Sequence, residues 1–143
     1  MKRTFTTEAE LTTFAAEFAR RLQPGDVVAF SGPLGSGKTT FIRAIVCERL
    51  EDDPTTSPTF TFRHRYTPDV TRNTPSIEHL DFFRIESESE LRELGLEEAF
   101  DGRSIVLVEW AEHAPSLLPS RRYEIMLAGV GNGPRTLELQ QRR

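Results

Sequence analysis

The chain has 143 residues, of which 37% are hydrophobic and 28% charged, and its formal net charge is −4. This profile is typical of one soluble globular domain rather than of a disordered or fibrous chain. The mildly acidic balance argues against non-specific binding of DNA or RNA, which needs a strongly basic surface, and no apolar run has the length of a membrane-spanning helix.

The start of the chain gives no sign of a signal peptide, because the basic pair Lys2-Arg3 has no apolar run behind it. Cys47 is the single cysteine and cannot form an internal disulfide, which favours a reducing compartment. We therefore expect a cytoplasmic protein with a single domain over residues 1–143.

An amphipathic helix is predicted after Thr7. The stretch Thr7–Glu10 fits a capping box, in which the threonine hydroxyl and the glutamate carboxylate bond to free backbone amides. Apolar residues then follow at three- and four-residue spacing: Leu11, Phe14, Phe18 and Leu22. Pro24-Gly25-Asp26 ends this helix, and the apolar run Val27–Phe30 predicts a buried strand.

Residues Gly32 to Thr39 form the pattern G-x-x-x-x-G-K-[ST] of a phosphate-binding loop. The loop lies between the predicted strand and a helical pattern that runs to Asp52-Asp53-Pro54, which is the context that the motif requires. Its glycines let backbone amides point inward at an anion, and the helix start adds its positive dipole end. Lys38 would span the β- and γ-phosphates of a nucleotide, and the Thr39 hydroxyl would ligate Mg²⁺.

A hydroxyl-rich segment follows this helix at residues 55–61, and it has two interpretations. It is either a switch that senses the nucleotide or a polar strand entry with a Ser-Pro-Thr turn. The alternation of Phe60, Phe62, His64 and Tyr66 predicts a strand, and the alternation over 76–82 predicts a second one. We expect the two strands to pair as an antiparallel hairpin.

His79 and Asp81 share one face of the second predicted strand. Two such residues without a cysteine cluster do not make a zinc site, so His79 is interpreted as structural. Asp81 stands at a strand end, where a carboxylate can serve the Mg²⁺ of a bound nucleotide.

The second half of the chain predicts a helix over Ser87–Phe100, with an apolar face of Leu91, Leu94, Gly95, Ala99 and Phe100. The apolar run from Ser104 to Trp110 then predicts a buried parallel strand with Glu109 at its end, beside the phosphate loop. Tyr123–Leu127 and Arg135–Leu139 predict two further strands. The fold class expected is α/β: a P-loop NTPase domain with a mixed parallel and antiparallel sheet flanked by helices.

Other P-loop classes fit the sequence less well. A GTPase needs an N/T-K-x-D segment, which neither lysine supplies, and a transporter ATPase needs a signature helix that is missing. A small kinase acting on a nucleoside or metabolite needs a lid, for which the interval Ala111–Arg122 leaves little room. The kinase stays the alternative to a minimal ATPase, and an adaptor that binds ATP without hydrolysing it also stays open.

Four stretches together resemble the TsaE family, the ATPases of bacterial tRNA threonylcarbamoyladenosine (t6A) biosynthesis. They are GPLGSGKTTF, SPTFT, HLDFFR and LVEW, in this order and at these distances. The resemblance implies a cytoplasmic ATPase that associates with the TsaB–TsaD complex. That pair transfers a threonylcarbamoyl group to adenosine 37 of tRNAs, so tRNA would be an indirect partner.

The resemblance also assigns residues. It implies that Gly35, Ser36, Gly37, Lys38, Thr39 and Thr40 bind the phosphates of ATP. It implies that Thr39 and Glu109 serve Mg²⁺, that Asp81 is a second acid needed for hydrolysis, and that Ser57–Thr61 is a switch. The segment Thr6-Thr7-Glu8 would lie near the adenine, and Arg135 near the nucleotide.

The expected mechanism uses Lys38 and the loop amides to hold ATP, with Thr39 and one acid on Mg²⁺ and the other acid orienting the attacking water. The sequence leaves open which of Asp81 and Glu109 is on the metal side. Thr59 is the candidate for sensing the γ-phosphate. Two positions depart from the family: Phe83 stands where tyrosine is common, and Pro33 where an acid is frequent.

Overall fold

The computed structural model describes residues 1–50, 62–68, 74–129 and 131–143. The predicted switch at Ser57–Thr61, Thr59 included, lies outside the described residues, as does the predicted helix end at 52–54. The strands are β1 (Lys2–Phe5), β2 (Val27–Ser31), β3 (Arg63–Tyr66), β4 (Ile77–Asp81), β5 (Ile105–Glu109), β6 (Arg122–Ala128) and β7 (Arg135–Arg142). The helices are α1 (Glu8–Arg21), α2 (Lys38–Leu50) and α3 (Glu88–Glu93), with the 3-10 helices η1 (Leu96–Ala99), η2 (Ala111–His113) and η3 (Pro115–Leu117).

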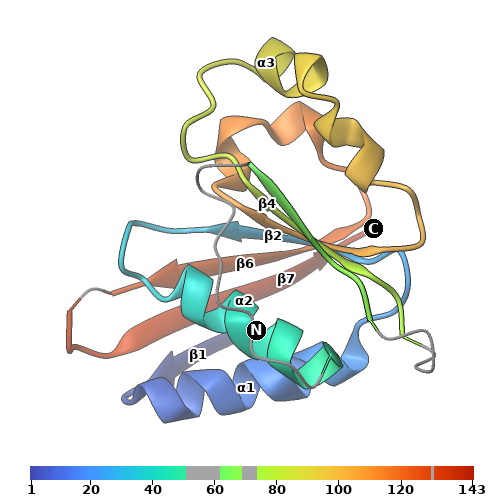
Figure 1. Cartoon of the computed structure of the whole chain (residues 1–143). Helices are drawn as coiled ribbons and strands as arrows, with labels where there is room; N and C mark the ends of the chain where they lie inside the picture. The colour runs from blue at the N-terminus through green and yellow to red at the C-terminus, as the bar shows by residue number, and fades with distance from the viewer. Residues whose placement is uncertain (51–61, 69–73, 130) are drawn as a thin grey trace.

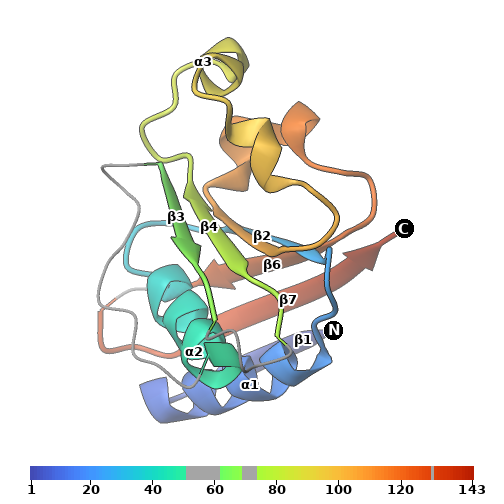
Figure 2. The same cartoon turned by 45° about the vertical axis from the view of Figure 1, so that its right-hand side comes forward.

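The described strands form one mixed sheet in the order β1-β7-β6-β2-β5-β4-β3. The four central strands β6, β2, β5 and β4 are parallel, and β7, β1 and β3 are added antiparallel at the two edges. Figures 1 and 2 show β2 and β6 side by side in the same direction, with β7 running the opposite way next to β6. This arrangement confirms the predicted α/β fold class and the predicted antiparallel hairpin of β3 and β4.

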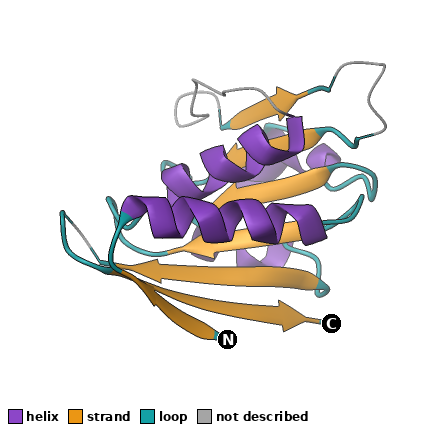
Figure 3. Cartoon of the chain, turned by 90° about the horizontal axis from the view of Figure 1, so that it is seen from below, coloured by secondary structure: helices purple, strands orange, loops and turns teal. Residues whose placement is uncertain are grey.

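Helices cover both faces of the sheet. Figure 3 shows α1 and α2 side by side on one face. Their aromatic residues are fully buried there, Phe41 against Phe30 of β2 and Phe18 against Tyr123 of β6. On the other face, α3 and the 3-10 helices pack on β4 and β5 (Figure 1). In the part of the chain that the structure describes, no helix combines the length and the apolar character needed to cross a lipid bilayer.

The start of α1 follows the sequence prediction with one difference. Thr7 is the N-cap, and its hydroxyl accepts a hydrogen bond from the Glu10 amide at 3.1 Å. The Glu10 carboxylate, however, bonds to the amide and hydroxyl of Thr6 rather than to the Thr7 amide. Thr6 directly follows strand β1, which the sequence did not predict and which pairs with β7.

The helix predicted over Ser87–Phe100 is wrong as a continuous element. Gly95 takes a left-handed backbone conformation with φ of 70°, which ends α3 and restarts the chain as η1. The break shifts the helical period, so Leu96 is buried, whereas Leu94, predicted on the apolar face, is 49% exposed. Glycine adopts this conformation without steric cost, which is why it commonly stops a helix.

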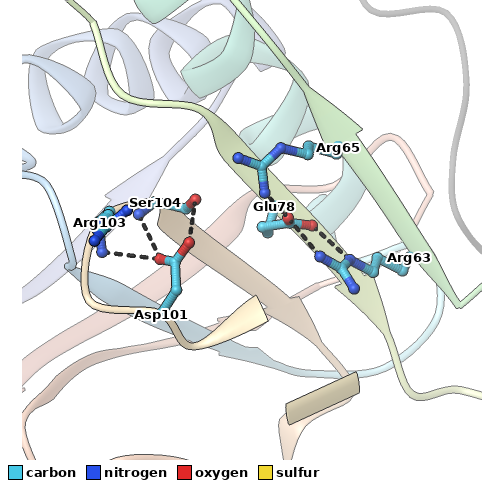
Figure 4. A network of polar contacts seen from close by, with 6 residues as sticks. All are labelled: Arg63, Arg65, Glu78, Asp101, Arg103 and Ser104. Carbon is cyan, nitrogen blue, oxygen red and sulfur yellow. Dashed lines mark hydrogen bonds and ion pairs between the residues drawn. The ribbon is translucent and has the colours of Figure 1, made fainter. Parts of the chain in front are cut away.

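A buried carboxylate ties the edge strand β3 to the sheet (Figure 4). Glu78 of β4 is fully buried and accepts two hydrogen bonds from Arg63, at 2.8 and 2.9 Å. Arg65 adds a third contact at 2.6 Å. A buried charge is tolerated only when it is paired and hydrogen-bonded, so this network fixes the hairpin whose second strand carries Asp81.

A capped turn sets the start of β5. The Asp101 carboxylate accepts hydrogen bonds from the amides of Arg103 and Ser104, both at 2.8 Å (Figure 4). The Ser104 amide bond is the main cause that holds the pKa of Asp101 below its usual value. Since the Ser104 carbonyl in turn accepts from the Gly25 amide at 3.2 Å, the turn joins β5 to the start of β2.

We expect Asp101→Ala to lower the melting temperature at neutral pH by a few degrees, because two amides lose their acceptor. A carboxylate with a lowered pKa in the folded state stabilises above its unfolded pKa of about 3.9, and this contribution is lost as the pH falls through the folded value. The difference in melting temperature between Asp101→Ala and wild type should therefore become smaller below about pH 4. The control is Glu93→Ala, because Glu93 is exposed and its carboxylate receives no hydrogen bond within the described residues. If the loss of melting temperature in Asp101→Ala did not depend on pH, the role of the Asp101 carboxylate in the turn would be contradicted.

Candidate functional site

The loop between β2 and α2 is held by close backbone contacts. Gly32 has φ of 134°, and a Cβ atom there would lie 2.1 Å from the Leu127 carbonyl oxygen of β6. Gly37 has φ of 104°, and its Cβ would lie 3.0 Å from a methyl group of Leu11 in α1. Only glycine fits both positions, so the sequence motif places the loop tightly between β6 and α1, with the N-terminus of α2 behind it.

A cavity of about 470 Å³ opens at the loop. This volume is in the usual range for small-molecule and cofactor sites. Most of the residues predicted for the site line it: Thr7, Glu8, Gly35, Gly37, Lys38, Thr39, Thr40, Asp81, Glu109 and Arg135. Thr6 lines it as well. Segments that are far apart in the sequence therefore meet at one place, at the carboxyl ends of the parallel strands.

Ser36 is the described member of the predicted set that does not line the cavity. It is 1% exposed, and its amide donates to the Pro33 carbonyl at 3.2 Å in a tight turn. Its hydroxyl has no hydrogen-bond partner within the described structure. The side chain thus lies beneath the loop rather than on its ligand-facing surface.

Lys38, the first residue of α2, folds back over the loop. Its ammonium donates hydrogen bonds to the carbonyls of Gly32 and Pro33, the latter at 3.0 Å, and lies 4.1 Å from the centre of the Trp110 ring. Burial lowers the pKa of Lys38, while nearby carboxylates, Glu109 foremost, act in the opposite direction. The ammonium is therefore held by two carbonyl oxygens and an aromatic ring, contacts that a phosphate group can replace.

Trp110 reaches Lys38 because the chain turns sharply after β5. Its backbone is left-handed, with φ of 57°, which is uncommon for a residue other than glycine. The ring also contacts Phe83 in a tilted arrangement, with 5.0 Å between ring centres, and packs near His113. Strained backbone of this kind is frequent at functional sites.

Thr39 and Glu109 join the loop to the end of β5. The Thr39 hydroxyl lies 3.0 Å from Glu109 Oε1, and Glu109 is 3% exposed. The other carboxylate oxygen, Oε2, lies 2.7 Å from Nε2 of His79 on β4. The end of β5 was predicted from the sequence to approach the loop; the contact with His79 was not.

Asp81 stands beside Glu109, because the two residues are register partners at the ends of the parallel strands β4 and β5. It is 4% exposed, and its Oδ1 accepts a hydrogen bond from the Phe83 amide at 2.9 Å. The structure thus brings both predicted carboxylates to one side of the cavity, where Glu109 contacts Thr39.

These oxygens suit a hard cation such as Mg²⁺. The described residues contain no group of three or more His, Cys, Asp or Glu side chains that could hold a metal by themselves. A metal at Thr39, Asp81 and Glu109 would therefore need phosphate oxygens and water to complete its coordination, as is usual for nucleotide-bound Mg²⁺.

The opposite end of the cavity is built by the N-terminal segment and the β6–β7 hairpin. Phe5 and Leu11 supply apolar surface, and Thr6 to Glu8 supply polar groups. Arg135 donates to the carbonyls of Gly35, Gly131 and Gly133 at 3.1, 2.7 and 2.8 Å. The arginine therefore connects the hairpin to the phosphate loop, and it lines the cavity.

Sequence reasoning missed several lining residues: Phe5, Leu34, Phe83, Trp110 and Gly131–Gly133. Phe5 lies on β1, whose pairing with the far end of the chain leaves no local pattern. The run Gly131-Asn132-Gly133 is a typical turn sequence that could have been read as the tip of a hairpin. Its position at the cavity depends on Arg135 and could not have been predicted from the turn alone.

The chain is similar to known proteins along nearly its whole length. It matches the family model of "Threonylcarbamoyl adenosine biosynthesis protein TsaE" over residues 5–137. The tRNA threonylcarbamoyladenosine biosynthesis protein TsaE of Rickettsia typhi is 37% identical over 140 residues, covering 96% of this chain and 93% of the relative. The protein of the same name from Bacillus subtilis is 36% identical over 127 residues, covering 89% and 75%.

A solved structure agrees with the sequence matches. The crystal structure of Bacillus subtilis YdiB superposes with a TM-score of 0.77 at 30% sequence identity, covering 99% of this chain and 84% of that one. The likeness supports the predicted P-loop NTPase fold over the length of the chain. On the family match and the identity of these relatives, the chain belongs to the TsaE family.

Proposed function

We propose that this protein is a Mg²⁺-dependent ATPase that supports threonylcarbamoyl transfer to adenosine 37 of tRNAs in the cytoplasm. It would act as an accessory protein of the TsaB–TsaD complex and meet tRNA only through these partners. The names of its relatives connect the family with t6A biosynthesis. The observation that carries the ATPase assignment is the bond between Thr39 of the phosphate loop and the buried Glu109, with Asp81 beside it.

The cavity divides into parts that match those of ATP. The loop amides and the start of α2 face the phosphates, where backbone donors and the helix dipole favour negative charge. The apolar pair Phe5 and Leu11, with Thr7 and Glu8 at the rim, forms the surface for the base. Arg135 and the hairpin tip close the space between these two ends.

The residues divide the chemistry among them. Thr39 and Glu109 would hold Mg²⁺, which would neutralise negative charge that develops on the phosphates during hydrolysis. We assign Glu109 to the metal side because its carboxylate already accepts a hydrogen bond from Thr39. Asp81 then orients the attacking water, whose oxygen bonds to the γ-phosphorus as the bond to ADP breaks.

Lys38 supplies the positive charge for this step. Its ammonium would leave the carbonyls of Gly32 and Pro33 and the Trp110 ring, and donate to the β- and γ-phosphates. Burial lowers the pKa of Lys38. A negative phosphate nearby would act against this effect, because an opposite charge stabilises the charged form of the lysine.

The interval Ala111–Arg122 favours hydrolysis over phosphate transfer to a second substrate. In a small kinase this interval would be a lid over the phosphates. Here its residues Ala111, Ala114 and Leu117 pack in the core on the face of the sheet that bears α3. Residues 111–122 do not line the cavity at the loop, so the described structure supplies no lid from this segment.

We expect Lys38→Ala to lower ATP hydrolysis by at least about 10²-fold, because one preorganised donor to the developing charge is lost. The assay measures phosphate release with Mg²⁺, with and without purified TsaB–TsaD, since the complex would complete the site. The matched control is Lys2→Ala, which removes the other lysine of the chain from the exposed surface of β1 and should hydrolyse ATP at the wild-type rate.

Two outcomes would contradict the proposal. Hydrolysis by Lys38→Ala at the wild-type rate would refute the site assignment. Transfer of labelled phosphate from ATP to a nucleoside or metabolite, with no stimulation by TsaB–TsaD and no nucleotide-dependent association, would favour the kinase.

The contact between Lys38 and Trp110 predicts a change in tryptophan fluorescence. Trp110 is the single tryptophan, and the ammonium on its ring should influence its fluorescence. We expect ligand-free Lys38→Ala to differ from ligand-free wild type in emission wavelength or intensity, and addition of ATP to shift the wild-type emission in the same direction. Identical ligand-free spectra of the two proteins would show that Lys38 does not lie on the ring in solution.

A further inference from the structure

His79 is a buried imidazole next to the site that the proposed mechanism does not use. It lies in the middle of β4, is 2% exposed, and does not line the cavity. Its Nε2 is 2.7 Å from Glu109 Oε2, in a pair that is buried on both sides. From the sequence, this histidine is interpreted as structural. Its neighbour on the same strand face, Ile77, is a core residue.

The surroundings of the ring decide where its proton lies. A carboxylate only accepts hydrogen bonds, so the short contact to Glu109 requires a proton on Nε2. Within the described structure the buried Nδ1 has no hydrogen-bond partner. A proton on Nδ1 would be a buried donor without an acceptor, which costs more than a buried lone pair. The contacts therefore place the ring proton on Nε2, where it can be donated to Glu109.

This tautomer gives Glu109 two donors, one on each carboxylate oxygen. Thr39 donates to Oε1 and His79 to Oε2. Two bonds on opposite oxygens fix the rotation of the carboxylate, whereas one would leave it free to turn. Because the Thr39 proton is directed at Glu109, the lone pairs of the Thr39 hydroxyl are left for a metal ion.

We propose that His79 is a positioning residue: it holds Glu109 in the orientation in which the carboxylate and the Thr39 hydroxyl together receive the metal of the bound nucleotide. This inference rests on the proposed function, since it assumes a metal at Thr39 and Glu109. Residues that donate to ligating groups typically change metal affinity or activity by about 10- to 100-fold when removed. A histidine that only fills the core would affect stability and leave metal affinity unchanged.

The test compares two substitutions at one position. His79→Gln keeps an N–H donor at about the reach of Nε2, and His79→Leu removes the donor while keeping apolar volume. The control is His64→Leu on β3, which removes the histidine that is the register partner of His79 and lies outside the cavity lining. Thermal melts of all variants check folding.

Metal binding is measured without catalysis, by electron paramagnetic resonance of Mn²⁺ with a non-hydrolysable ATP analogue. We expect His79→Leu to weaken Mn²⁺ binding about 10-fold or more, His79→Gln to restore most of it, and His64→Leu to leave it unchanged. Binding of the analogue in EDTA should stay within about twofold of wild type for all three, because the phosphate loop is untouched. Equal Mn²⁺ affinity of wild type and His79→Leu would overturn the proposal, as would equal losses in His79→Leu and His79→Gln.

A second measurement uses wild-type protein and does not depend on whether the variants fold. Nitrogen-15 NMR of the histidine side chains in metal- and nucleotide-free protein, with His79→Gln for assignment where it folds and ring-to-backbone correlation otherwise, should show a proton on Nε2 of His79. An unprotonated Nε2 would overturn the proposal. If wild type binds Mn²⁺ and the analogue but fails to hydrolyse ATP with TsaB–TsaD, the ATPase assignment fails while the role of His79 is still decided by these two measurements.

Discussion

The hydrogen bond between Thr39 and Glu109 is the contact on which the site depends. It joins the first turn of α2 to the end of β5, which the parallel pairing of β2 and β5 brings alongside the loop. The same edge of the sheet carries Asp81, one strand further on. A loop that binds phosphates by its amides and helix dipole recognises an anion; the two carboxylates beside a threonine hydroxyl are what suit it to a nucleotide with its metal.

The rest of the fold holds this edge in place from both sides. On one side, the Arg63–Glu78–Arg65 network attaches β3 to β4 and so supports the strand that ends in Asp81. On the other side, Arg135 connects the β6–β7 hairpin to the loop at Gly35. Lys38 contacts the carbonyls of Gly32 and Pro33 and the Trp110 ring. In the proposed function it is the one cation of the site that leaves these contacts for a phosphate.

Local patterns in the sequence identified most of the residues that the structure brings together at this cavity. The loop and Thr39 follow from a motif, Glu109 from an apolar run that ends in an acid, and Asp81 from the end of an alternating strand; parallel strands place such ends together. What the sequence could not supply depends on pairing at long range. Strand β1 is short and mostly exposed, so nothing local marked it, and Phe5 was missed with it. Gly95 was read as part of a helix face, although its left-handed conformation moves burial from Leu94 to Leu96. The role of His79 needed a distance to Glu109, which alternation along β4 does not give.

The central claim is that ATP and Mg²⁺ occupy the cavity formed by the loop, the ends of β4 and β5, and the segment from Phe5 to Glu8. A crystal structure of the protein with Mg²⁺ and a non-hydrolysable ATP analogue tests it most directly. We expect phosphates against the loop amides, the metal on the Thr39 hydroxyl beside Glu109, and the base against Phe5 and Leu11. The Lys38 ammonium should have moved from Trp110 to the phosphates. A nucleotide bound elsewhere, or a metal that is not in contact with Thr39, would contradict it.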